Sequence, residues 1–208
     1  VAEPEVREIV DFLAEVGKRL RLDDNPWLQE SFALALQAGG LAEPILRGVY
    51  DDLPRMFDAD AMLALIDKSV GIDYLDGWVA GDYPHANCRV RAVGTRQLHI
   101  TAGNVPVVAA LTIVRGALTK SDVLIKAPSN DPLTANAIAR SLIDVDASHP
   151  VTKHVAVAYW KGGDEEMDKQ IVRVSRIDKI TAWGGMSSVK HIQKFLTPGI
   201  DLTALNPK

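Results

Sequence analysis

From about residue 97 the chain alternates short strand-like runs with segments of helical periodicity. The runs are rich in β-branched and apolar residues, and each is followed by a segment whose apolar residues recur at helical spacing. This alternation predicts an α/β fold with a parallel sheet and helices on both faces, because parallel strands need a crossover connection. The expected strands are 97–101, 122–126, 154–159 and 179–182, and the expected helices are 107–118, 132–143, 164–174 and 187–195.

Residues 1–71 are expected to form a helical N-terminal layer that precedes the α/β domain, residues 72–208. Apolar residues recur at helical spacing from Val6 to Leu20, and the pattern ends at a turn-forming cluster, residues 23–26. Further helices are expected over 28–38 and 41–56 and from an Asp58 cap to about residue 70. The glycine-containing segment 72–86 is predicted to be the linker.

Composition excludes several classes of function. The net charge of −4 is mild and its charges are interspersed, so neither a nucleic-acid footprint nor a polybasic membrane patch is expected. A single cysteine, Cys88, excludes an internal disulfide and a Cys-rich zinc site, and the five histidines lack metal-ligand spacing, so no metal is expected. Without a long apolar run or a secretory signal, the chain is expected to be soluble and cytoplasmic.

The turn after the expected strand 179–182 has the form of a phosphate cradle. Gly184 and Gly185 permit close approach of the backbone, Ser187 supplies a hydroxyl, and a helix follows. Helix N-termini expose unpaired N–H groups and a partial positive charge that suit phosphate. The alternative is an ordinary glycine-rich turn. Neither the Rossmann glycine fingerprint nor the P-loop motif occurs, so those two sites are disfavoured.

Other polar residues follow the remaining strand ends. Lys126 could reach a ribose or phosphate oxygen, or it could be a solvated surface lysine. The Asn104 amide could donate to a developing oxyanion, although asparagine before a helix is more often a cap. Cys88 lies beside Arg89 and Arg91, which could lower its pKa, but a bystander thiol is the simpler interpretation.

Four sequence elements occur in an order that resembles the aldehyde dehydrogenase superfamily, and within it the LuxC-type acyl-CoA reductases of bacterial bioluminescence. These elements are AGNVP (102–106), RGAL (115–118), IKAPSNDP (125–132) and AWGG (182–185). The resemblance covers residues 72–208 well and the N-terminal helices loosely. It implies a Rossmann-type sheet that binds NADPH, in an enzyme that reduces a fatty acyl thioester to an aldehyde through a cysteine-bound acyl intermediate.

The resemblance also implies roles for individual residues. Asn104 matches the oxyanion-hole asparagine of the family, and Lys126 matches the lysine that contacts the adenosine ribose. Ser129 stands where NAD-preferring relatives often have a glutamate, and without that carboxylate a 2′-phosphate meets no like charge, which favours NADP. Gly184 and Gly185 match the pyrophosphate turn, with Gly185 in place of the usual serine.

The chain departs from the family pattern most seriously at the nucleophile. The nucleophilic cysteine of the family follows the last helix recognised here, and Cys88 does not match its position. The first hypothesis is therefore that the chain is the cofactor-binding part of a longer reductase and is inactive alone. Its implied partners are an acyl-CoA or acyl-protein thioester and an acyl-protein synthetase, with a homo-oligomeric state. The alternatives are a non-catalytic nucleotide-binding module and a thioesterase-like enzyme with Cys88 as nucleophile.

Overall fold

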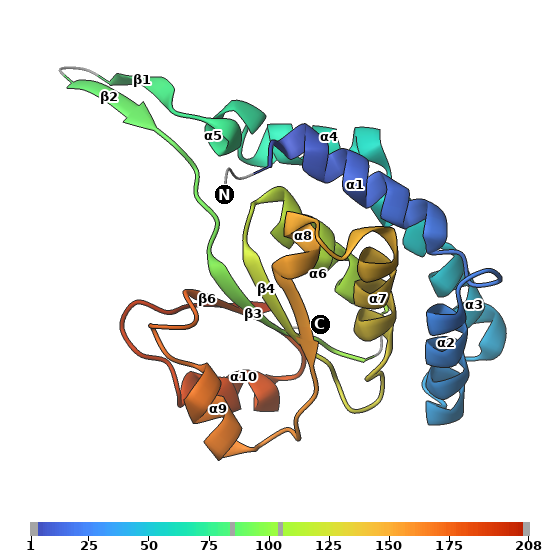
Figure 1. Cartoon of the computed structure of the whole chain (residues 1–208). Helices are drawn as coiled ribbons and strands as arrows, with labels where there is room; N and C mark the ends of the chain where they lie inside the picture. Colours follow the sequence, from blue (N-terminus) through green and yellow to red (C-terminus); the bar gives the residue numbers. More distant parts are fainter. Residues whose placement is uncertain (1–3, 84–85, 104–105, 206–208) are drawn as a thin grey trace.

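The computed structural model describes residues 4–83, 86–103 and 106–205 of the chain. These residues form a five-stranded sheet, a separate two-stranded hairpin and helices packed around the larger sheet (Figure 1). All neighbouring strands of the larger sheet are parallel, in the order β5-β4-β3-β6-β7. The α/β prediction is therefore confirmed. The strands are β3 (Arg96–Ile100), β4 (Asp122–Lys126), β5 (Val155–Ala158), β6 (Lys179–Trp183) and β7 (Asp201–Leu205).

The sheet is wound in two directions from its central strand. The chain runs from β3 outward through β4 to β5, and then returns to place β6 on the other side of β3. The strand order therefore reverses between β3 and β6, and crevices at such switch points, outside the carboxyl ends of the strands, are where open α/β sheets bind ligands. The connecting helices are α6 (Val107–Leu118), α7 (Thr134–Asp146), α8 (Pro150–Lys153), α9 (Glu165–Ile171) and α10 (Met186–Gln193).

Each face of the sheet has its own apolar core. On one face, Val123 and Ile125 of β4 pack with α6, α7 and the N-terminal helices. On the other face, Leu98 of β3 and Ile180 of β6 pack with Ile192 of α10 and with the segments around α9. This arrangement confirms helices on both faces, and it leaves the carboxyl ends of the strands lined by α9 and α10.

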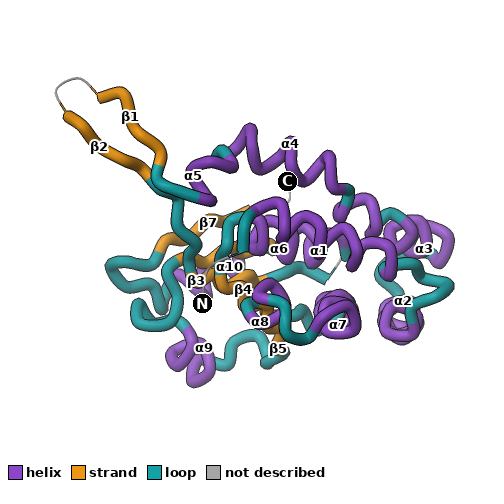
Figure 2. Tube along the Cα trace, turned by 45° about the horizontal axis from the view of Figure 1, so that its top comes forward, coloured by secondary structure: helices purple, strands orange, loops and turns teal. Residues whose placement is uncertain are grey.

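The N-terminal helices form a layer that packs on α6 and α7 (Figure 2). The apolar stripe of the first helix is buried, as its spacing predicts. The second helix is capped by Asn25, whose side chain accepts a hydrogen bond of 3.1 Å from the Leu28 amide. The elements of this layer are α1 (Val6–Arg19), α2 (Pro26–Ala38), α3 (Glu43–Asp51), the 3₁₀ helix η1 (Leu53–Phe57) and α4 (Ala59–Ser69).

Two expectations about the N-terminal half are wrong in detail. The predicted helix 41–56 is split into α3 and η1, since Pro54 lacks the amide hydrogen that an α-helix needs there. The predicted linker 72–86 contains α5 (Ile72–Asp76) and β1 (Val79–Tyr83). The strand β1 pairs antiparallel with β2 (Ala86–Val90) in a hairpin that projects from the body (Figures 1 and 2).

Two further elements have no counterpart in the sequence prediction. Helix α8 is a single turn that begins at Pro150, and β7 follows the last helix and extends the sheet beside β6. Both are short, and β7 lies at a sheet edge with no buried residue of its own. Hydrogen bonding to β6 holds this segment as a strand, so its own sequence shows no hydrophobic pattern that would predict one.

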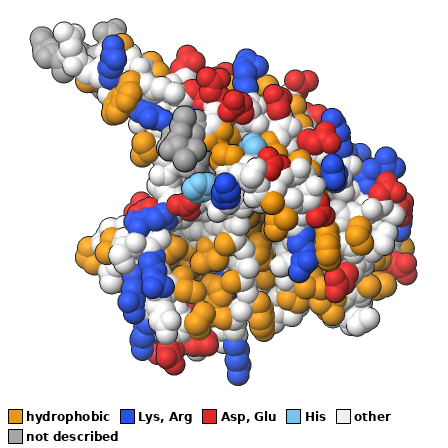
Figure 3. All heavy atoms as spheres, viewed as in Figure 1, with side chains coloured by type: hydrophobic (Ala, Val, Ile, Leu, Met, Phe, Trp, Pro, Cys, Tyr) orange, Lys and Arg blue, Asp and Glu red, His pale blue; other side chains and the backbone are white. Residues whose placement is uncertain are grey.

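One face of the molecule separates charged from apolar surface. Charged side chains cover the N-terminal helices, while hydrophobic side chains gather below them, over the sheet (Figure 3). Among the described residues, no helix is long and apolar enough to cross a bilayer.

Candidate functional site

A cavity of about 280 Å³ opens at the carboxyl ends of the strands, on the face that α9 and α10 cover. It lies next to the switch point, because β3, β4 and α10, which follows β6, all contribute to its wall. Residues that the sequence singles out, Lys126 and Ser187, meet there. The cavity is lined by Ile100, Lys126, Gly162, Gly163, Asp168, Ser187, Ser188, His191 and Ile192.

Lys126 is the last residue of β4, and its side chain reaches across to the loop that follows β5. Its Nζ atom lies 5.0 Å from the centroid of the Trp160 ring, a cation–π distance. Burial lowers the pKa of Lys126, and the nearby Asp168 carboxylate partly opposes that shift. The structure thus places a half-buried amine on the cavity wall, in a fixed position against an aromatic ring rather than free in solvent.

The N-terminus of α10 is open beside the cavity. Gly185 is its cap residue, and no side chain caps the helix. Its φ of −63° is available to any residue, so backbone strain does not explain the glycine. A Cβ atom built at Gly185 has no neighbour within 4 Å, and one at Gly184 makes only ordinary contact with Ser188. The first turn of α10 is therefore accessible to an anion.

The remaining candidates of the sequence lie elsewhere. Ser129 is exposed in the turn after β4 and is not among the cavity-lining residues. Asn104 lies outside the described residues, so its role stays a prediction. Cys88 is a free thiol on β2 opposite Gly81, in the projecting hairpin and far from α10 in Figure 1.

The cavity contains a group of side chains that sequence reasoning missed. Asp168 of α9 is 3% exposed, and its two carboxylate oxygens accept hydrogen bonds from Trp160 Nε1 at 2.9 Å and from His191 Nε2 at 2.8 Å. In the sequence, Asp168 follows an acidic run, residues 164–166, that is explained by helix capping, and Asp164 does cap α9. Nothing in the linear pattern relates Asp168 to His191, 23 residues away.

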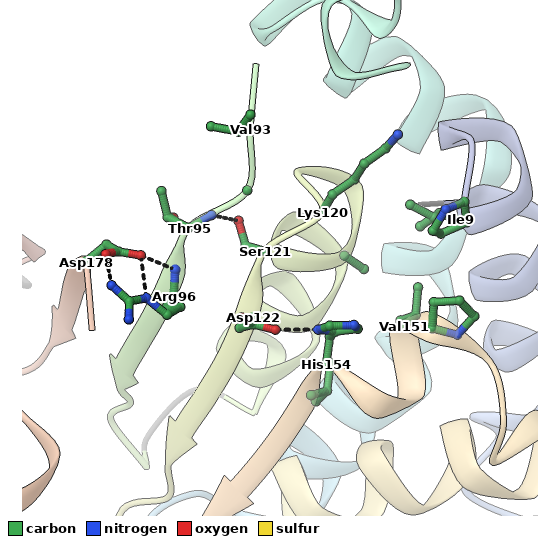
Figure 4. Close-up of a pocket in the computed structure, with 15 residues that line it drawn as sticks. Ile9, Val93, Thr95, Arg96, Lys120, Ser121, Asp122, Val151, His154 and Asp178 are labelled. Carbon is green, nitrogen blue, oxygen red and sulfur yellow. Dashed lines mark hydrogen bonds and ion pairs between the residues drawn. The ribbon is translucent and has the colours of Figure 1, made fainter. Parts of the chain in front are cut away.

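A second hollow, of about 450 Å³, lies at the amino ends of the strands (Figure 4). Its charged groups pair with one another: Asp122 contacts His154, and Arg96 Nε donates to Asp178 Oδ2 at 3.0 Å. The Arg96 guanidinium lowers the pKa of Asp178 to about 2. Since these charges already have partners, and parallel sheets bind ligands at the other end of their strands, this hollow is the weaker candidate.

The donors at the carboxyl-end cavity suit phosphate and ribose oxygens. An uncapped helix N-terminus offers backbone N–H groups, the Ser187 and Ser188 hydroxyls lie on its first turn, and Lys126 adds an ammonium group. The two glycines leave room for a group to approach the backbone. These features fit the pyrophosphate and the adenosine ribose of a dinucleotide.

Comparison with known sequences gives one consistent result. The family model described as acyl-CoA reductase (LuxC) matches residues 1–203. The chain is 32% identical over 206 residues to a long-chain acyl-protein thioester reductase from Aliivibrio fischeri, and 37% identical over 217 residues to long-chain acyl-protein thioester reductase 2 from Photobacterium leiognathi. Each match covers 98% of this chain but 42% of the relative. The chain therefore spans less than half the length of these relatives.

Solved structures with the same fold are aldehyde dehydrogenases and related enzymes. An NADP-dependent glyceraldehyde-3-phosphate dehydrogenase from Bacillus halodurans, complexed with NADP, superposes with a TM-score of 0.70 at 18% identity, covering 97% of this chain and 40% of that one. A betaine aldehyde dehydrogenase from Staphylococcus aureus, complexed with NAD⁺, gives 0.72 at 17% identity, covering 100% and 39%. At these identities the likeness establishes the aldehyde dehydrogenase fold of the chain and nothing more.

Proposed function

The chain belongs to the LuxC family of acyl-CoA reductases, and on that premise we propose that it is the cofactor-binding part of an NADPH-dependent acyl-thioester reductase that produces a fatty aldehyde. The observation that carries the proposal is the cavity at the switch point of the sheet, where Lys126 and the open N-terminus of α10 face the same space. A bound nicotinamide dinucleotide supplies the hydride for the reduction.

In this proposal residues in and beside the cavity hold different parts of the dinucleotide. The backbone at Gly184 and Gly185 and the first turn of α10 receive the pyrophosphate, with the Ser187 hydroxyl as a further donor. Lys126 binds the adenosine ribose. Ser129 places no carboxylate at residue 129, and this supports NADP as the cofactor because a 2′-phosphate meets no like charge at that position.

The acyl half of the reaction is proposed from the relatives. The relatives compared above are named long-chain acyl-protein thioester reductases, which supports a long-chain acyl-protein thioester as substrate, and the family description supports acyl-CoA as an alternative donor. An acyl-protein synthetase is proposed as the partner that supplies the acyl-protein. Asn104 donates to the oxyanion that forms when a cysteine thiolate attacks the thioester carbonyl. That cysteine is proposed to lie outside these 208 residues, so the chain alone is expected to bind cofactor without turnover.

A charge placed at Gly185 tests the pyrophosphate assignment. Gly185→Asp puts a carboxylate where the phosphate is proposed to bind, in open space and at a cap position that aspartate favours, so the helix should not be weakened. We expect the Kd for NADPH, measured by titration of the complete protein, to rise at least about tenfold, because like charges at close range repel. The matched control Gly185→Ser adds a neutral cap and should keep the Kd within about threefold.

Two outcomes would contradict the proposed function. If Gly185→Asp binds NADPH as tightly as the unaltered protein, the dinucleotide does not lie at α10. If the complete protein forms no aldehyde from a long-chain acyl thioester with either NADPH or NADH, the reductase assignment is wrong.

A further inference from the structure

Asp168 is a buried carboxylate that the proposed function leaves unused. Asp168 lines the proposed cofactor cavity, and its side chain is buried. Burying a carboxylate costs free energy unless its oxygens have hydrogen-bond partners. Asp168 is not needed to cap α9, since Asp164 already accepts from the Met167 amide at 3.1 Å. Its partners are instead two side chains of the cavity region, Trp160 and His191. The arrangement holds these two side chains in fixed positions.

The bond to Asp168 determines how His191 presents its ring. Because a carboxylate accepts, Nε2 of His191 carries the hydrogen of the 2.8 Å bond. The other ring nitrogen, Nδ1, has no hydrogen-bond partner in the part of the chain that the structure describes. The His191 side chain is 23% exposed and lines the cavity with Lys126. When the ring carries a hydrogen on both nitrogens, Nδ1 is also a donor.

The same network connects His191 to Lys126. Trp160, held by Asp168 through its indole N–H, is the ring over which the Lys126 ammonium lies. Two nitrogen donors thus line one cavity, and the single carboxylate among its lining residues, Asp168, is directed at Trp160 and His191. A phosphate monoester, which carries a charge of about −1.5 to −2 at neutral pH, matches two such donors, whereas a ribose hydroxyl needs only one.

We propose that His191, oriented by Asp168, binds the 2′-phosphate of NADP together with Lys126 and so selects NADP over NAD. The inference rests on the proposed function and deepens it. The missing carboxylate at Ser129 removes an obstacle to the 2′-phosphate, and His191 supplies the attraction. Asp168 is the positioning residue, because it acts through His191 and not on the cofactor.

The test compares the Kd values of NADPH and NADH in the complete protein. His191→Gln keeps a polar side chain of similar length but removes the ionisable ring, so we expect the Kd for NADPH to rise about tenfold while that for NADH stays within about twofold. His191→Arg keeps a cation and should preserve most of the preference. Asp168→Asn should reduce the preference in the same direction as His191→Gln.

A matched control is available at the opposite end of the sheet. His154 pairs with Asp122 at the amino ends of the strands, so His154→Gln removes the same type of ion pair away from the cavity and should change neither Kd.

The possible outcomes separate this proposal from the proposed function. If His191→Gln weakens NADPH and NADH equally, or weakens neither, His191 does not recognise the 2′-phosphate, although the cofactor site stands. A preference of the unaltered protein for NADH would overturn the inference in the same way. If neither dinucleotide binds the unaltered protein, the cofactor site itself is wrong.

Discussion

His99 lies in the middle of the sheet on β3, where 7% of its surface is exposed. Its Nε2 atom is 2.9 Å from Gln97 Oε1, and its Nδ1 atom is buried without a partner among the described residues. Burial, reinforced by the charge of Lys179, lowers the pKa of His99 to about 4. In the folded protein the His99 ring is therefore neutral above about pH 4, and protonation of this ring favours the unfolded chain.

This shift predicts a pH dependence of stability. The contribution of His99 is fully present above its unfolded pKa, 6.5, and is lost as the pH falls from there through the folded pKa. The loss amounts to about 3 kcal/mol of the unfolding free energy. Urea unfolding measures this loss when the unaltered chain and His99→Gln are compared at pH 7 and pH 4. Carboxylates titrate alike in the two proteins, so the difference between them reports His99. Equal pH dependence in the two proteins would refute the prediction.

Residues could be assigned to the site from the sequence only where a strand end marks them. Lys126 ends β4 and Ser187 lies just after β6, two strands whose hydrophobic runs are clear, and the structure places both residues on one cavity. Asp168 and His191 carry no such mark, since they belong to two helices that meet only after the sheet has formed.

At the scale of elements, the sequence predicted best where the local signal and the tertiary role agree. The residue ranges predicted for β4 and α6 agree with the structure, because each has an unbroken hydrophobic pattern bounded by turn residues. The sequence does not reveal β1, which lies in the predicted linker, or β7, because their hydrogen-bond partners, rather than their own side chains, make them strands. Pro54 divides the predicted helix 41–56, because proline cannot supply the amide hydrogen that the helix interior needs.

Two helical glycines should respond to the same substitution with opposite signs. Gly116 lies where α6 crosses β4, and a Cβ there would come within 2.1 Å of Val123 Cγ2, so Gly116→Ala should destabilise the fold by about 1–3 kcal/mol. Gly48 in α3 has open space around it, so Gly48→Ala should stabilise by up to about 1 kcal/mol. Chemical denaturation of both variants provides the comparison. A stabilising Gly116→Ala would show that α6 and β4 are not packed this closely.

At the scale of the whole molecule, one apolar core runs from the N-terminal helices into the α/β part. It includes Leu13 of α1, Leu28 of α2, Ile113 of α6 and Ile138 of α7. The predicted domain boundary at residue 71 therefore does not divide this core, and the two-domain organisation stays a prediction. We expect the two parts to unfold as one cooperative unit.

A buried hydroxyl group ties these parts together and allows that expectation to be tested. Tyr50 of α3 is fully buried, and its Oη atom lies 2.8 Å from Ser31 Oγ of α2 and 2.7 Å from Thr134 Oγ1 of α7. Tyr50→Phe leaves these hydroxyls without that partner and should cost about 1–2 kcal/mol, while Tyr74→Phe, at a side chain that is 37% exposed, should cost nothing measurable.

Native-state hydrogen exchange distinguishes a shared core from two independent ones. If the core is shared, Tyr50→Phe lowers the opening free energy of amides in α1 and in β4 by the same amount, because both become exposed in a single global event. If only the N-terminal helices lose protection, they form a separate cooperative unit. The contact between α2 and α7 would then be a docking interface between two domains rather than part of one core.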